Sequence, residues 1–170
     1  MTPTMAPEAT TTATAALKKA CDEAYLKGTG SCSNAVWEVI KSMSNAQEPY
    51  RVANVLMDHM SANWKTVELE EGYNLANQGI VVVGGTKVEQ GNGHVIVIYP
   101  GAKKLNGGYM YFYKKGNKDL MLNGTKLYPL CLSTSMGKWP GANSNGDKTV
   151  WDPWGSDKGF EGVKFFTPKA

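Results

Sequence analysis

Apolar residues in the first half of the chain recur at helical spacing. Val36, Val39, Ile40 and Met43 follow Cys32 at offsets that place them on one face of a helix. Comparable apolar stripes lie before and after this segment. We therefore expect helices over residues 15–27, 33–44, 50–63 and 68–78.

The second half of the chain changes to strand-like patterns. Short β-branched or aromatic runs bounded by glycine and proline are typical of strands. They predict strands over residues 79–85, 94–99, 109–113, 126–132 and 163–167. The glycine-rich segment that precedes the last strand carries three tryptophans and predicts a structured loop.

This order of elements favours an α+β fold, in which N-terminal helices pack on an antiparallel sheet. Residues 1–14 are rich in Thr and Ala, which predicts a flexible tail. A chain of 170 residues suits one domain, which we expect to span residues 15–170.

Cys32 falls at the start of the second predicted helix, behind a lead segment rich in glycine and serine. Unpaired backbone N–H groups and the positive end of the helix dipole lie at such a position. Both stabilise a thiolate, so we expect a lowered pKa of Cys32 and a nucleophilic sulfur. The alternative is that Cys32 is a small buried core residue.

His94 opens a predicted strand, directly behind the turn Gly91-Asn92-Gly93. Side chains alternate along a strand, so His94 shares one face with Ile96 and Ile98. If that face packs on the Cys32 helix, His94 lies near Cys32 and can act as its base. The alternative is a surface histidine or a satisfied core histidine.

Charge and hydropathy narrow the function classes. The net charge of +3 is mild, and no cluster of Lys and Arg forms a stripe with aromatic residues, so we expect no nucleic acid partner. The longest apolar run, about residues 95–99, is too short to span a membrane. The N-terminal residues also lack the pattern of a Sec signal.

The remaining cysteines and histidine add little chemistry. Three cysteines leave at least one thiol unpaired within the chain, and whether Cys21 and Cys131 pair stays open. His59 falls inside a predicted helix and is interpreted as structural or exposed. Neither Cys-x-x-Cys nor His-x-x-x-His occurs, so we expect no metal and no cofactor.

Short motifs spread over roughly residues 17–135 carry a family resemblance. They are Tyr25-Leu26-x-Gly28-Thr29, Cys32-Ser33, Ala53-Asn54-x-x-Met57-Asp58, Trp64-Lys65, Gln78-Gly79-Ile80-Val81-Val82, Gly93-His94-Val95-x-Val97 and Tyr128-Pro129-Leu130-Cys131. In this order and spacing, the set resembles family 1 of the type VI secretion amidase effectors. These effectors are NlpC/P60-like cysteine peptidases that cut peptidoglycan stem peptides.

The resemblance implies a papain-like NlpC/P60 core and a role for each of three residues. Cys32 would attack the substrate, His94 would act as the base, and the backbone carbonyl of Ser133 would orient the histidine. Rival orienting groups in the glycine-rich segment are Asn143, Asp147 and Asp152.

The resulting expectation is a peptidoglycan endopeptidase that hydrolyses an amide bond of the stem peptide, which the resemblance identifies as the bond between D-glutamate and diaminopimelate. It further implies an antibacterial toxin, made in the bacterial cytoplasm and secreted without a Sec signal into the periplasm of a target cell. Its expected partners are a component of the secretion apparatus and a periplasmic immunity protein. The alternatives are an amidase or acyltransferase on another amide, and a non-catalytic cell-wall-binding module that uses the five tryptophans.

Overall fold

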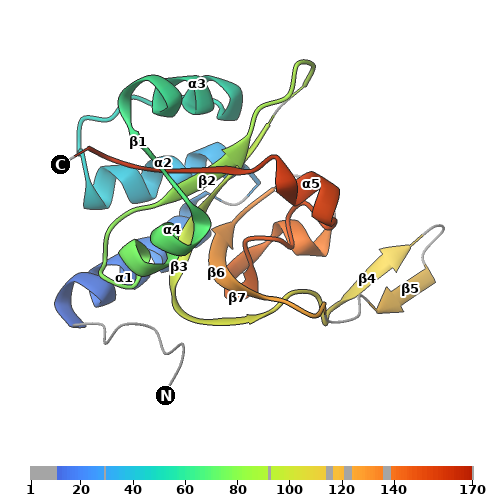
Figure 1. Ribbon diagram of the computed structural model, residues 1–170. Coiled ribbons are helices and arrows are strands. Elements are labelled where there is room, and N and C mark those ends of the chain that lie inside the picture. The colour runs from blue at the N-terminus through green and yellow to red at the C-terminus, as the bar shows by residue number, and fades with distance from the viewer. Residues whose placement is uncertain are drawn as a thin grey trace.

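A six-stranded antiparallel sheet forms the centre of the computed structural model, which describes residues 11–28, 30–91, 93–113, 117–120, 124–135 and 139–169 (Figure 1). The helices of the described residues are α1 (Thr11–Lys27), α2 (Cys32–Met43), α3 (Ala53–Asn63), α4 (Leu69–Ala76), the 3-10 helix η1 (Pro140–Ala142) and α5 (Asp157–Glu161). The α+β class predicted from the sequence is confirmed.

The sheet has the strand order β1-β8-β2-β3-β6-β7, and each neighbouring pair is antiparallel. Its strands are β1 (Lys65–Val67), β2 (Val83–Thr86), β3 (His94–Leu105), β6 (Leu127–Ser133), β7 (Ser144–Thr149) and β8 (Lys164–Thr167). A separate hairpin consists of β4 (Met110–Tyr113) and β5 (Asn117–Leu120). The last strand, β8, thus returns into the sheet between β1 and β2.

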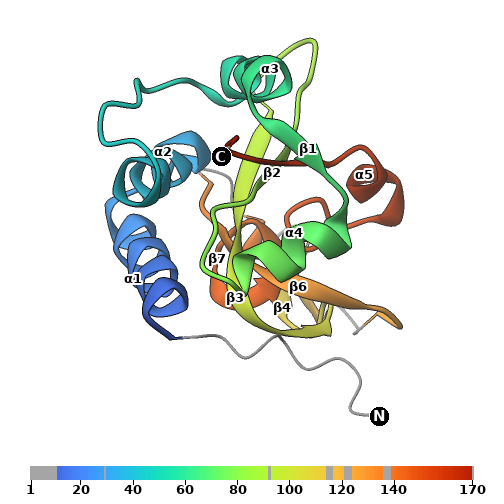
Figure 2. The ribbon, with the colours of Figure 1, turned by 60° about the vertical axis from the view of Figure 1, so that its left-hand side comes forward.

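Helices cover both faces of the sheet. Figures 1 and 2 show α1 and α2 on one side and α4 on the other. The first half of β3, from Val95 to Ile98, is therefore fully buried on both faces. On the α1–α2 side, Val36 and Val39 of α2 contribute to the same core. Burial on both sides explains why β3 begins as a continuous apolar run rather than as an alternating one.

The face of β3 that carries His94 packs on α4, not on α2. A side chain at Gly72 in α4 would lie 3.2 Å from Ile98 Cδ1, so Ile98 points toward α4. The β2–β3 register is regular from Val97 back to His94, so His94 shares the face of Ile98. The condition under which the strand pattern alone would place His94 near Cys32, that this face packs on the Cys32 helix, is therefore not met.

The chain also becomes helical earlier than expected. Residues 11–14 belong to α1, and Thr14 is buried and donates to the Asn77 carbonyl over 3.2 Å. The rest of the expected tail, residues 1–10, lies outside the described residues. A tertiary hydrogen bond thus extends the helix into a segment whose composition is typical of tails.

Among the described residues, the structure contains no helix with the length and apolarity needed to cross a bilayer.

Candidate active site

Cys32 is the first residue of α2, and two hydroxyl groups hold the chain around it. Ser31 caps the helix, because its Oγ accepts a hydrogen bond from Asn34 N over 3.3 Å. Thr134, which follows β6, places its Oγ1 3.0 Å from Gly28 O and 2.8 Å from Ser31 O. The end of β6 therefore fixes the lead segment that positions the cysteine.

Cys32 and His94 line the same cleft, which has a volume of about 580 Å³. His94 reaches this cleft as the first residue of β3, at the end of the sheet, although its strand face packs on α4. The cleft lining also includes hydroxyl and aromatic side chains, namely Ser33, Tyr50, Thr86, Ser135, Trp139 and Trp154. None of the described residues that line the cleft is Asp, Glu, Lys or Arg.

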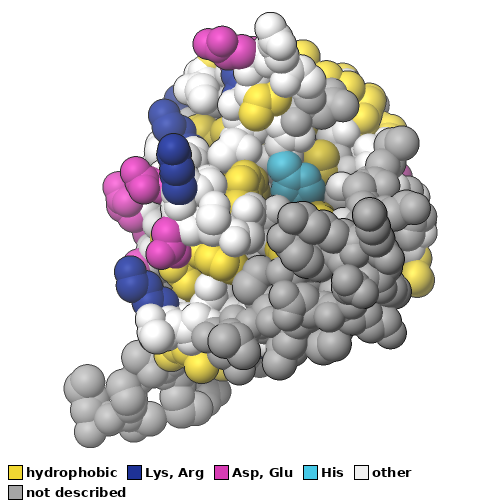
Figure 3. All heavy atoms as spheres, turned by 90° about the vertical axis from the view of Figure 1, so that its right-hand side faces the viewer, with side chains coloured by type: hydrophobic (Ala, Val, Ile, Leu, Met, Phe, Trp, Pro, Cys, Tyr) yellow, Lys and Arg dark blue, Asp and Glu magenta, His cyan; other side chains and the backbone are white. Residues whose placement is uncertain are grey.

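Among the atoms that Figure 3 colours, no charged side chain lies next to the histidine of the face shown. Figure 3 shows a face on which a histidine side chain lies among hydrophobic and uncharged polar atoms, while charged side chains gather along one border. A ligand in the cleft therefore meets hydroxyl groups, aromatic rings and backbone among the described lining residues.

The His94 ring is held by a hydroxyl group and by an aromatic ring. Its Nε2 lies 2.8 Å from Ser133 Oγ. The Trp154 ring makes an edge contact with it, with ring centroids 5.4 Å apart and an interplanar angle of 73°. Trp154 is fixed in turn, because its Nε1 donates to Thr86 Oγ1 over 3.1 Å. The imidazole is thus confined on two sides.

This network selects one tautomer of the neutral imidazole. Ser133 Oγ donates its single hydrogen to Ala142 O over 2.7 Å, so toward His94 the same oxygen acts as an acceptor. His94 Nε2 therefore carries the hydrogen, and Nδ1 holds the free lone pair. Nδ1 is consequently the ring nitrogen that can accept a proton.

The orienting atom differs from the expected one. The resemblance implies the backbone carbonyl of Ser133, whereas the hydrogen bond to the ring is made by its side-chain hydroxyl. The rival orienting groups lie in other networks, since their side chains accept hydrogen bonds from backbone N–H groups. These rivals are Asn143, Asp147 and Asp152.

The other cysteines and the other histidine lie apart from this cleft. Cys21 and Cys131 are free and buried, so the pairing that the sequence left open is absent between them. His59, in α3, is half-buried, and its Nδ1 lies 3.2 Å from Asn63 Nδ2. Of the described cysteines and histidines, only Cys32 and His94 line the cleft.

Burial sets the protonation states of both cleft residues. Burial raises the pKa of Cys32, and the backbone N–H groups of Val95, Ser33 and Cys32 itself oppose this effect without overcoming it. Burial lowers the pKa of His94 to about 4. The expected lowering of the Cys32 pKa is therefore wrong, because the loss of hydration outweighs the helix terminus. At rest the cleft therefore holds a neutral thiol and a neutral imidazole.

We expect the pH dependence of this pair to follow from those directions. His94 keeps its lone pair free down to about pH 4, and Cys32 ionises only at alkaline pH. Alkylation of Cys32 by iodoacetamide should therefore be slow at pH 6 and accelerate above the ordinary thiol range. Peptide mass spectrometry across a pH series measures the rate, with the buried Cys21 and Cys131 as internal references. A rate already at its maximum at pH 6 would contradict the neutral pair.

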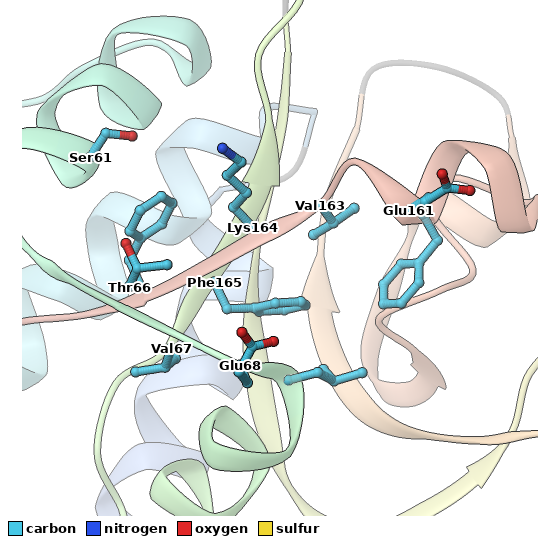
Figure 4. A pocket seen from close by; sticks show the side chains of 11 residues that line it. Ser61, Thr66, Val67, Glu68, Glu161, Val163, Lys164 and Phe165 are labelled. Atoms are coloured by element: carbon cyan, nitrogen blue, oxygen red, sulfur yellow. The ribbon is translucent and has the colours of Figure 1, made fainter.

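A second hollow, of about 570 Å³, lies beside β1 and β8 (Figure 4). Its polar lining includes Thr66, Glu68, Glu161 and Lys164. No cysteine or histidine is among the residues described around it, so it offers no thiol nucleophile and no imidazole base.

Two parts of the site escaped the sequence analysis. Thr134 lies in a Ser-Thr-Ser run at the end of a predicted strand, and this hydroxyl-rich strand end is the signal that points to it. Trp154 lies in the turn-forming segment Asp152-Pro153-Trp154-Gly155, and no pattern in the sequence pairs it with His94.

Within the described ranges, no group of three or more His, Cys, Asp or Glu side chains is arranged to hold a metal ion.

The comparison of the chain with protein-family models finds no match, and neither does the comparison with curated proteins.

Proposed function

We propose that the protein is a cysteine hydrolase of amide bonds, and specifically a peptidoglycan endopeptidase. The observation that carries this proposal is the presence of Cys32 and His94 in one cleft, with Ser133 bound to the His94 ring. A nucleophile, a base and a group that orients the base are the parts that covalent acyl transfer needs. The free Nδ1 of His94 suits the role of base.

In the proposed reaction, Cys32 Sγ attacks the carbonyl carbon of the amide while His94 Nδ1 takes the thiol proton. Backbone N–H groups at the start of α2, including that of Cys32, stabilise the oxyanion. The tetrahedral intermediate then expels the amine, which receives the proton from His94, and a thioester remains on Cys32. A water molecule that gives its proton to His94 then attacks the thioester carbonyl, and the Cys32 sulfur leaves and takes that proton back from His94, which restores the thiol and the neutral imidazole.

Because both residues are neutral at rest, His94 must remove the thiol proton during the reaction, which it would not need to do in a preformed ion pair. Because burial raises the pKa of Cys32, the thiol keeps its proton until substrate is bound. The proton must therefore move during the attack itself, which is general-base catalysis. In this mechanism, the activity depends on a neutral His94, which burial maintains down to about pH 4.

The choice of peptidoglycan is supported by the ordered motifs between residues 17 and 135, and we extend it to the bond between D-glutamate and diaminopimelate. The hydroxyl and aromatic lining of the cleft suits an extended peptide read through its amide groups. Secretion into a target periplasm, and a periplasmic immunity protein as partner, belong to the same proposal and rest on the same motifs.

Digestion of purified sacculi tests the proposal directly. The purified protein is incubated with sacculi, and the soluble fragments are identified by mass spectrometry. Release of peptides cut between D-glutamate and diaminopimelate is the expected result. Cleavage of another amide bond would show that the assigned bond is wrong and that the protein is still an amide hydrolase. Binding to sacculi with no cleavage would favour a cell-wall-binding module instead.

Ser133→Ala should lower kcat without unfolding the protein. The change removes the acceptor for His94 Nε2–H, so both tautomers become accessible and Nδ1 is no longer reserved for the proton. We expect kcat to fall at least about tenfold and at most about 10⁴-fold, the loss that a wrong tautomer causes in Ser-His-Asp enzymes. The measurement is fragment release at saturating sacculi or with a soluble stem peptide.

Ser144→Ala provides the matched control for this prediction. Ser144 is a buried serine opposite Ser133 in the β6–β7 pair, and its Oγ donates to Cys131 O over 2.7 Å. Ser144→Ala also removes one serine hydroxyl, but one that makes no bond to His94. Its kcat should therefore stay close to that of the wild type. Equal losses in the two variants would show that Ser133 acts only through stability.

A further inference from the structure

Asn54 belongs to one of the family-like motifs, and the mechanism gives it no role. It is the second residue of α3 and is half-buried. Its side-chain amide makes four hydrogen bonds to the backbone between β2 and β3. Nδ2 donates to Val88 O over 2.8 Å and to Gly91 O over 3.2 Å. Oδ1 accepts from Val88 N and from Gly93 N, each over 3.1 Å.

These bonds use the full capacity of the Asn54 amide. An asparagine amide offers two N–H donors and one carbonyl oxygen with two lone pairs. Both donors and both lone pairs bond to the backbone of one short segment, residues 88–93, which ends directly before His94. A side chain of another size or with other polar atoms could not reproduce this set of bonds.

The close approach of Asn54 also explains the glycine that precedes His94. A Cβ at Gly93 would lie 2.7 Å from Asn54 Oδ1 and 2.1 Å from Thr86 O. Only glycine fits between the amide and β2, so the backbone enters β3 at one fixed place. Gly93, Val88 and His94 all line the cleft, so the same amide also fixes one cleft wall.

We infer that Asn54 is a positioning residue for His94, which acts by clamping the backbone of Gly93 at the start of β3. For turnover, this inference rests on the proposed function. Its geometric content, the placement of the His94 ring, does not depend on that function.

A salt bridge between α3 and the segment that links β2 to β3 supplies the matched control for the Asn54 variants. Lys87 Nζ lies 2.8 Å from Asp58 Oδ1, and both side chains are more than half exposed. Exposed pairs of this kind contribute little to stability or geometry. Asp58→Asn therefore removes a link between α3 and this segment while leaving the Asn54 amide in place.

The experiment compares Asn54→Ala, Asn54→Asp and Asp58→Asn in the full chain, below the unfolding temperature of each variant. With a soluble stem peptide, we expect Asn54→Ala to lower kcat about 10- to 100-fold, the range for a misplaced catalytic group, with little change in KM. Asn54→Asp keeps the acceptor for Gly93 N and should recover part of this loss. Asp58→Asn should match the wild type.

NMR titration of the histidines gives the readout that a purely structural role would not move. In the wild type, burial lowers the pKa of His94 to about 4. Release of Gly93 in Asn54→Ala should let water reach the ring and raise this pKa. His59 lies five residues further along α3, outside the cleft lining, and serves as the internal reference in the wild type and the Asn54 variants.

The outcomes separate the two proposals. If Asn54→Ala and Asp58→Asn agree in both the His94 titration and kcat, the positioning role is overturned. If the wild type hydrolyses no amide bond, the proposed function fails, and the titration alone decides the role of Asn54. If the titration moves while kcat does not, the placement of the His94 ring by Asn54 stands, and the expected effect of Asn54 on turnover is overturned.

Discussion

Cys32→Ala is expected to abolish hydrolysis of peptidoglycan peptides and to leave the fold intact. In the proposed mechanism no other thiol can replace Cys32, since Cys21 and Cys131 are buried outside the cleft and burial raises their pKa values. Loss of the nucleophile in a hydrolase costs on the order of 10⁶-fold in kcat. The measurement is fragment release from sacculi by mass spectrometry, with circular dichroism to show that the variant is folded.

Cys131→Ala is the control for this experiment. Cys131 is a fully buried residue of β6, and its Sγ donates to Thr149 O over 3.3 Å. Its replacement leaves a small cavity and is expected to lower stability while keeping kcat within a few-fold, since cavities act on folding free energy. Full activity in Cys32→Ala, or loss of activity in Cys131→Ala alone, would reject Cys32 as the nucleophile.

The helices that position the site follow closely from the sequence, because local signals and packing agree there. The helix expected over 33–44 is α2, Cys32–Met43. Its apolar stripe of Val36, Val39 and Ile40 is buried, and Ser31 caps its start. A cysteine at a helix start could therefore be predicted from residue types and spacing alone.

The strands diverge where tertiary pairing overrides local preference. The strand expected to end at Tyr99 continues to Leu105, because Pro100 and Gly101 fall at a shift in the β3–β6 register, where a residue without N–H is tolerated. The polar segment Ser144–Thr149, expected as loop, forms β7 through its pairing with β6. Strand preference depends on such neighbours, which no local pattern describes.

The electrostatics of the site could not be predicted for the same reason. A pattern of period two shows that His94 and Ile98 share a face, but not whether α2 or α4 covers it. A helix start indicates N–H groups near Cys32, but not how much water the folded cleft keeps. Burial decides the pKa directions of both residues, and burial belongs to the complete fold.

His94→Ala is expected to lower kcat by at least about 10²-fold, the lower range for loss of a general base. Burial raises the pKa of the Cys32 thiol, so without His94 the sulfur keeps its proton at neutral pH. The residual activity should therefore increase steadily with pH up to alkaline values, whereas the wild type has a base available from about pH 4 upward. Rates with a soluble stem peptide from pH 5 to pH 9 measure both effects.

His59→Ala is the matched control for His94, because it removes the other imidazole of the chain. His59 lies in α3, bonds to Asn63 on its own helix and is absent from the cleft lining. Its loss should change kcat by less than about threefold and leave the pH profile as in the wild type, as expected of a residue outside the general-base step. Equal losses in two folded variants would mean that neither imidazole is the base. An unchanged pH profile in His94→Ala would mean that Cys32 loses its proton to another group.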